Sequence, residues 1–196
     1  MESFVAHPVR TDLQAPLEVA RWRALFQWIL AIPHLIVAGA MAYVAGALVF
    51  IAWFAILFTG RMPEGIYRFL ALYLRYQWRA YAYAGFLHED FPPFEFEMSG
   101  ADDGHSPARL DIDPPGELSR GLIFVKWLLA IPHYVVLFFV GIAAVVAYLI
   151  GWFSVLFTGR WPEGVRAFLV GVFRWSNRVT GYVYLLTDEY PPFSLR

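Results

Sequence analysis

Four arginines are the residues best placed to do chemistry, because they form two pairs of equal spacing inside long apolar stretches. They are Arg75, Arg79, Arg174 and Arg178. A spacing of four residues places both guanidinium groups of a pair on one face of a helix. At the centre of a bilayer each arginine costs about 2.5–3.5 kcal/mol on insertion scales. Four would cost on the order of 10 kcal/mol unless they are paired, hydrated or able to reach the membrane surface.

Two interpretations of these arginines are open. In the functional one, both pairs point inward and line a cationic crevice that binds an anionic lipid headgroup or solute. In the structural one, the side chains extend to the membrane surface or pair with acids such as Glu64 and Glu163, and they serve packing alone.

Two histidines and two further arginines are weaker candidates. His34 and His133 each follow a proline, and symmetry could bring them together as a proton relay or a metal pair. Their structural interpretation is that each satisfies a carbonyl freed by the proline. Two histidines without a third ligand at fixed spacing do not define a metal site, so we predict none. Arg61 and Arg160 lie in glycine-containing turns, where we expect them among lipid headgroups.

No enzyme signature accompanies these residues. The chain has no GxSxG elbow, no HExxH motif and no dinucleotide-binding glycine fingerprint. With no cysteine, it lacks disulfides, thiolate metal sites and thiol nucleophiles. A formal net charge of −1 gives no basic excess of the kind that binds nucleic acid. We therefore expect a non-enzymatic protein without a cofactor or a nucleic-acid partner.

The composition predicts a membrane protein. Of the 196 residues 59% are hydrophobic and 16% charged, with a mean hydropathy of +0.52. Soluble domains average about 45–50% apolar and about 25% charged residues. So much apolar surface also excludes a disordered chain. The protein is expected to be embedded in lipid.

The chain contains two tandem copies of one sequence unit. Shifted by 99 residues, the sequence aligns with itself without a gap from Trp28 to Phe94, and 28 of these 67 pairs are identical. The shared blocks are WxLAIPH, WFxxLFTGRxPEGxxxFL, RxxxR, and an acidic pair followed by [FY]PPF. A repeat of this quality indicates a tandem duplication.

Each unit is expected to contain an interfacial helix, a membrane span and a second long helix. The interfacial helices are predicted at residues 17–31 and 116–130, and the spans at 33–58 and 132–157, because the proline in each IPH motif should break the apolar run. Gly60 suits a left-handed helix end, and Pro63 and Glu64 suit the start of a new helix. The second helices, 63–87 and 162–186, could lie in the interface or cross back, and we favour a return span.

Short strands flank the helices. Residues 94–98 and 108–113 alternate apolar and charged side chains across a Gly-, Asp- and Ser-rich turn, which predicts a hairpin. Residues 5–13 and 193–196 are the matching strands, and four strands could form one sheet on a membrane face. Such a sheet requires an even number of crossings per unit, so we predict parallel repeats related by an axis along the membrane normal.

The blocks IPH, LFTGRxPEG, RxxxR and [DE][DE]YPPF resemble a prokaryotic membrane family catalogued as domain of unknown function 4389. The resemblance covers nearly the whole chain, once per copy. The first copy departs from the pattern with His88-Glu89-Asp90-Phe91, where the second has the more typical Thr187-Asp188-Glu189-Tyr190. The resemblance implies membrane location and a helical-hairpin unit, and it carries over no catalytic residue.

Together these features predict an all-α, polytopic membrane protein with two parallel helical-hairpin repeats, interfacial helices and a four-stranded β cap. The expected divisions are repeat 1 at residues 1–94, a hairpin linker at 95–107 and repeat 2 at 108–196. The expected function is that of an accessory, scaffold or partner-binding subunit, in contact with membrane lipids and another membrane protein or complex. The alternative is a small carrier or a lipid- or anion-binding protein that uses the arginine crevice. The expected location is the cytoplasmic (inner) membrane, with multiple crossings and the strands in the cytoplasm.

Overall fold

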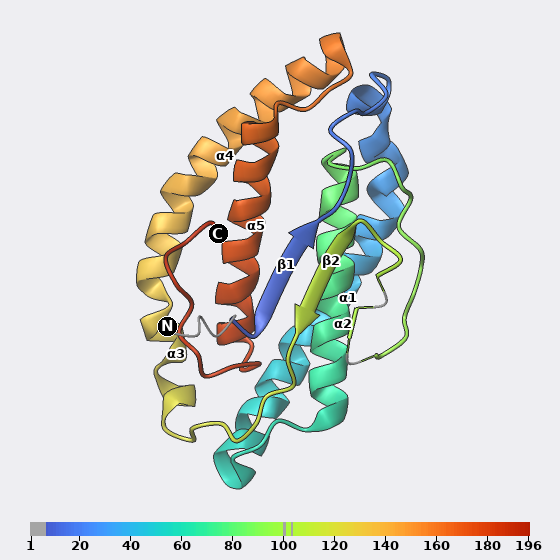
Figure 1. Ribbon diagram of the computed structural model, residues 1–196. Helices are drawn as coiled ribbons and strands as arrows, with labels where there is room; N and C mark the ends of the chain where they lie inside the picture. The colour runs from blue at the N-terminus through green and yellow to red at the C-terminus, as the bar shows by residue number, and fades with distance from the viewer. Residues whose placement is uncertain (1–6, 100, 103) are drawn as a thin grey trace, which may run out of the picture.

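The computed structural model describes residues 7–99, 101–102 and 104–196. Its elements in chain order are β1 (Val9–Leu13), α1 (Arg23–Thr59), α2 (Glu64–Ala84), β2 (Ala108–Ile112), a 3-10 turn (Leu122–Phe124), α3 (Lys126–Leu129), α4 (Ile131–Thr158) and α5 (Glu163–Val183). The helices form two antiparallel hairpins, α1–α2 and α4–α5, with the two strands beside them (Figure 1).

The glycine corners of the two hairpins form as predicted. Gly60 and Gly159 end α1 and α4 in the left-handed region, each with φ of 73°. The Gly60 N–H donates to the Ile56 carbonyl, which satisfies one of the last open carbonyls of α1. After Pro63 the chain turns back as α2, and Glu64 occupies the first turn, where the helix dipole favours a negative charge.

The two strands pair with each other across the repeats. β1 and β2 are antiparallel, and Thr11 lies opposite Leu110. These two residues are 99 positions apart and are therefore equivalent in the two units. An antiparallel pair of equivalent strands has a two-fold axis through its self-paired position, perpendicular to the strands. The sheet thus relates the two hairpins by an approximate two-fold axis.

The predicted parallel arrangement of the repeats is wrong, because this axis inverts one hairpin relative to the other. The Leu118 N–H, just before the second unit's helices, donates to the carbonyl of Gly60 at the end of α1. The Val19 N–H, just before α1, donates to the carbonyl of Gly159 at the end of α4. Each helix corner therefore lies against the start of the other unit, and α1 and α4 run in opposite directions (Figure 1).

The predicted four-stranded cap and its hairpin are also wrong. The described residues form a two-stranded sheet, and residues 94–98 and 193–196 are not strands. The alternating phenylalanines of 94–98 instead pack on helices: Phe94 stacks on His34 of α1, and Phe96 stacks on Tyr76 of α2. Alternation therefore arose from aromatic packing, and the partner of β2 is β1. Residues 5 and 6 of the predicted first strand lie outside the described residues.

The predicted interfacial helix at 17–31 is wrong in the first unit. There α1 begins at Arg23 and continues through Pro33 for 37 residues. In the second unit, where 116–130 was predicted, the same region breaks into the 3-10 turn and α3, and Pro132 occupies the first turn of α4. A proline removes only one donor and clashes with one preceding turn. The first unit accommodates it within the helix, and the second places it at a helix start, where its missing N–H costs nothing.

The helices and strands are arranged in layers. β1 packs on α5 and β2 packs on α2, while α1 packs on α2 and α4 packs on α5. In Figure 1 the strands lie in front of α5 and α2, and α1 passes behind α2. Buried residues of α2 such as Leu70, Leu74 and Trp78 contribute to the main core. Two helical stretches, Arg23–Thr59 and Lys126–Thr158, are long and apolar enough to cross a membrane.

Candidate functional site

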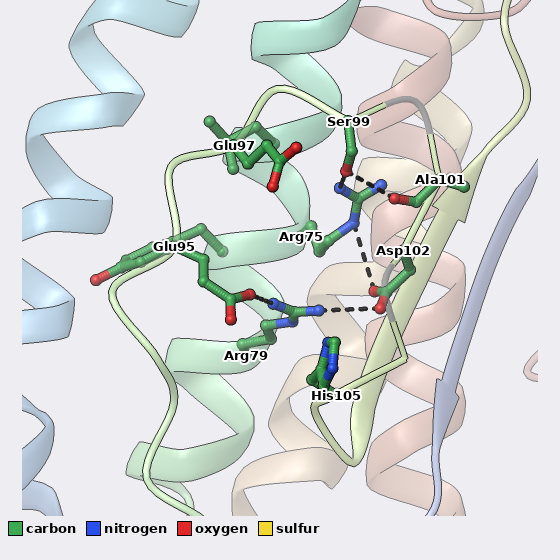
Figure 2. Close-up of a pocket in the computed structure, with 10 residues that line it drawn as sticks. Arg75, Arg79, Glu95, Glu97, Ser99, Ala101, Asp102 and His105 are labelled. Carbon is green, nitrogen blue, oxygen red and sulfur yellow. Dashed lines mark hydrogen bonds and ion pairs between the residues drawn. The ribbon is translucent and has the colours of Figure 1, made fainter.

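A cavity lies in the first repeat, between α2 and the segment that follows it. It has a volume of about 460 Å³. Its walls come from the middle of α2 and from described residues between 95 and 105 (Figure 2). The lining residues are Leu72, Arg75, Tyr76, Arg79, Glu95, Glu97, Ser99, Ala101, Asp102 and His105.

Asp102 is the acid that holds both arginines of this cavity. Its Oδ1 lies 2.9 Å from Nη2 of Arg79, and its Oδ2 lies 3.4 Å from Nε of Arg75 (Figure 2). The same carboxylate accepts the backbone N–H of Gly104 at 2.9 Å and that of Leu110 at 3.0 Å. Only 2% of the Asp102 side chain is exposed, against 5% of Arg75. Among the described residues, two buried cations and one buried anion thus share an ion-pair network.

Further groups complete the surroundings of the two arginines. Arg79 Nη1 reaches Glu95 at 3.2 Å, and Arg75 donates to the Ser99 hydroxyl and the Leu110 carbonyl. The Leu110 contact means that an α2 arginine fastens β2 to the helix. The cavity therefore carries charges of both signs, suited to a ligand with both an anionic and a cationic group.

In the second repeat the arginines occupy a different setting. Arg174 Nε donates to the Thr11 carbonyl of β1 at 2.9 Å, which repeats the bond from Arg75 to Leu110. Its Nη1 donates to the Leu195 carbonyl at 3.2 Å, and its Nη2 lies 3.9 Å from Asp12. Arg178 makes no ion pair within the described part of the chain. The four arginines thus lie on both sides of the strand pair, two on α2 and two on α5.

The histidines of the two IPH motifs are held within their own repeats. His34 is fully buried, its Nδ1 lies 2.8 Å from the Tyr76 hydroxyl, and its ring stacks on Phe94. His133 accepts the Trp175 indole N–H at 3.1 Å and stacks on Phe193. The equivalent contacts explain why IPH and PPF occur together. No cluster of three or more His, Asp or Glu residues suited to a metal is found among the described residues.

The corner arginines bind the opposite repeat. Arg61 pairs with Glu117 at 3.0 Å, and Arg160 pairs with Glu18 at 3.6 Å, both largely exposed. Each pair accompanies a backbone bridge between the same two residues. Exposed ion pairs contribute little energy, so the backbone bridges are the stronger connection.

The sequence analysis did not single out Asp102, which lies in the Gly-, Asp- and Ser-rich turn of the predicted hairpin. Its signal was indirect: two arginines on one helix face require a buried acid, and an Asp two residues before a glycine is suited to a turn that bonds its own backbone. The sequence contains several acids between 89 and 113 and did not distinguish among them.

The fold and site define a class of protein built from two inverted helical hairpins joined by a strand pair, with one highly apolar helix in each hairpin. The family described as Domain of unknown function (DUF4389) matches the chain twice, at residues 21–95 and 120–194. The protein belongs to this family, in two tandem copies. No curated protein and no solved structure matches the chain.

Proposed function

We propose that the protein is a membrane-embedded, non-enzymatic accessory subunit that presents a polar surface to a partner protein. The observation that carries this proposal is the distribution of exposed apolar side chains. In the most apolar window of Lys126–Thr158 only 6% of residues are buried, and in that of Arg23–Thr59 only 22%. An exposed apolar surface of this extent marks an interaction site, and its length along two helices supports contact with lipid.

The opposite layer is suited to a partner in water. It contains the short strand pair, where the exposed Arg10 and Asp113 form an ion pair. We place it on the cytoplasmic side of the cell membrane, because its arginines match the positive charge that cytoplasmic segments carry.

The experiment is photo-cross-linking in intact membranes with a benzophenone amino acid. At position 97, whose Glu side chain is exposed beside the cavity, the probe should yield a discrete protein adduct. At position 43, where Tyr43 is 85% exposed on α1, it should yield lipid adducts. Recovery of the chain in the soluble fraction would refute membrane embedding, and lipid adducts alone from position 97 would refute a partner on the polar layer.

A second candidate function is binding of a lipid headgroup or a small charged solute, and the cavity beside Arg75 and Arg79 favours it. Native mass spectrometry with anionic and zwitterionic lipids tests this candidate. Arg79→Gln should remove a bound molecule, while Arg178→Gln, the equivalent change in the second repeat, should retain it. An identical lipid profile for both variants and the unmodified chain would eliminate the candidate.

A further inference from the structure

The inverted repeats have a direct consequence for how the protein can lie in a membrane. Segment 85–118 begins where α2 ends and returns to the corner where α2 begins, since Leu118 bonds to Gly60. Segment 9–19 likewise runs from beside Gly181, near the end of α5, to Gly159 at its start. Non-helical chain therefore runs alongside the full length of both amphipathic helices (Figure 1).

These non-helical segments cannot cross the hydrocarbon core of the membrane in contact with lipid. A backbone outside helices and closed barrels leaves polar groups unsatisfied there, so it is tolerated only when buried in protein or facing water. Arg10 and Asp113 form an ion pair at 2.6 Å in which the side chains are 46% and 51% exposed. Arg10 belongs to β1, one position from the self-paired Thr11, and Asp113 directly follows β2. The centre of this sheet is level with the middle of α2, because Arg75 bonds to Leu110. Helices along the membrane normal would therefore place this exposed pair within the hydrocarbon core, with Arg10 the nearer of the two residues to its centre.

The length of α1 leads to the same conclusion. Its 37 residues extend about 55 Å, and residues 25–58 contain no charged side chain. To fit a hydrocarbon core of about 30 Å, the helix would have to tilt by roughly 57°. Spanning helices tilt by about 0–40°. The apolar stretch of α1 is too long for a span and presents no such conflict when it lies along the membrane.

We propose that α1 and α4 lie in the plane of the membrane, embedded in a single leaflet, with lipid acyl chains covering their outer faces. This inference rests on the proposed membrane embedding and replaces multiple crossings with none. The distribution of exposed side chains agrees with this placement, because those of α1 and α4 are mostly apolar, while the exposed ion pair Arg10–Asp113 lies on the strand layer. Trp22, Trp28 and Trp127, each about half exposed or more, lie near the helix starts, where indole rings can occupy the headgroup region.

The two corners distinguish this placement from a spanning one. In a flat protein both corners face the same aqueous compartment. In a spanning protein with inverted repeats they face opposite compartments. The chain contains no cysteine, so single cysteines report position without a background. Gly65 and Gly164 are equivalent, exposed residues in the first turns of α2 and α5, and a Cβ at either meets no atom within 4 Å.

The experiment labels Gly65→Cys and Gly164→Cys with a membrane-impermeant maleimide, in right-side-out and inverted membrane vesicles of the expressing cells. Both variants should label in the same vesicle orientation, with a difference of ten-fold or more between orientations. A third variant, Tyr43→Cys, should be protected until detergent is added. Labelling of Gly65→Cys and Gly164→Cys in opposite orientations would overturn the flat placement while leaving membrane embedding intact.

Two further outcomes distinguish failure of the proposed function from failure of the flat placement. If the chain does not sediment with vesicles, the proposed function fails, and the inference fails with it. If Tyr43→Cys in the membrane fraction forms a disulfide-linked dimer upon oxidation, in place of lipid protection, a second copy covers the apolar face and the inference is overturned. Gly65→Cys is the matched control for this oxidation. It should form no disulfide-linked dimer, whether lipid or a second copy covers the apolar face.

Discussion

Replacing Asp102 by asparagine should strongly destabilise the first repeat. The change keeps the shape of the side chain and removes the negative charge that holds Arg75 and Arg79. Both guanidinium groups are about 95% buried at this site. Removing one member of a buried charge network costs about 3–5 kcal/mol, because the remaining charges lose part of their compensation without regaining water. This is a large part of a typical folding free energy of about 5–15 kcal/mol.

The assay is equilibrium unfolding of the detergent-solubilised chain, followed by tryptophan fluorescence. Glu95→Gln is the matched control, since this carboxylate also pairs with Arg79 but is 41% exposed. It should cost no more than about 1 kcal/mol. Arg79→Met combined with Asp102→Asn should cost less than the sum of the single changes, because the two groups are in direct contact. If Asp102→Asn unfolds within 1 kcal/mol of the unmodified chain, the buried network does not stabilise the fold as argued.

The remaining predictions concern a buried histidine and the close contact between Gly151 and Trp161. Burial lowers the pKa of His88 from 6.5 to about 4; the unfolded chain therefore binds a proton between these pH values that the folded chain does not. The free energy of unfolding should fall by about 3 kcal/mol as the pH drops through this window, and this histidine should not affect it above the window. His88→Thr introduces the residue found at the equivalent position of the second repeat. This variant should flatten the same part of the stability–pH profile. Gly151→Ala should lower the melting temperature by several degrees, because its Cβ would lie 1.8 Å from the Trp161 ring; Gly141→Ala on the same helix, with open space around it, should not, and equal melting temperatures would contradict the packing.

The elements that recur in the sequence were predictable from it. The duplication, the glycine corners and the family follow from identical blocks at fixed spacing. Helix formation at 64–84 and 163–183 also follows, because the polar residues fall on one face. These features depend on local sequence, and both copies carry the same local signals.

The relation between the copies was not predictable in the same way. Alternation at 94–98 and at 108–112 is the same pattern, yet Phe94 packs on His34 while Leu110 enters a sheet. An internal repeat in the sequence shows that the two units have similar structures. It does not show which symmetry operation relates one unit to the other. That operation is decided by which strands pair, a contact about 100 residues apart in the chain. Asp102 was missed for the same reason, since its burial depends on its tertiary contact with Arg75 and Arg79 of α2.

The pairing of Thr11 with its own counterpart Leu110 bears on the history of the chain. A strand that pairs with a copy of itself about a two-fold axis does not need the linker between the copies. One unit alone could therefore associate with a second, separate unit through the same strand pair and the same contacts between each helix corner and the start of the other unit. The present protein has the geometry of a homodimer whose subunits became joined by gene duplication and fusion, and a family member with a single unit is expected to exist in solution or membrane as a symmetric pair.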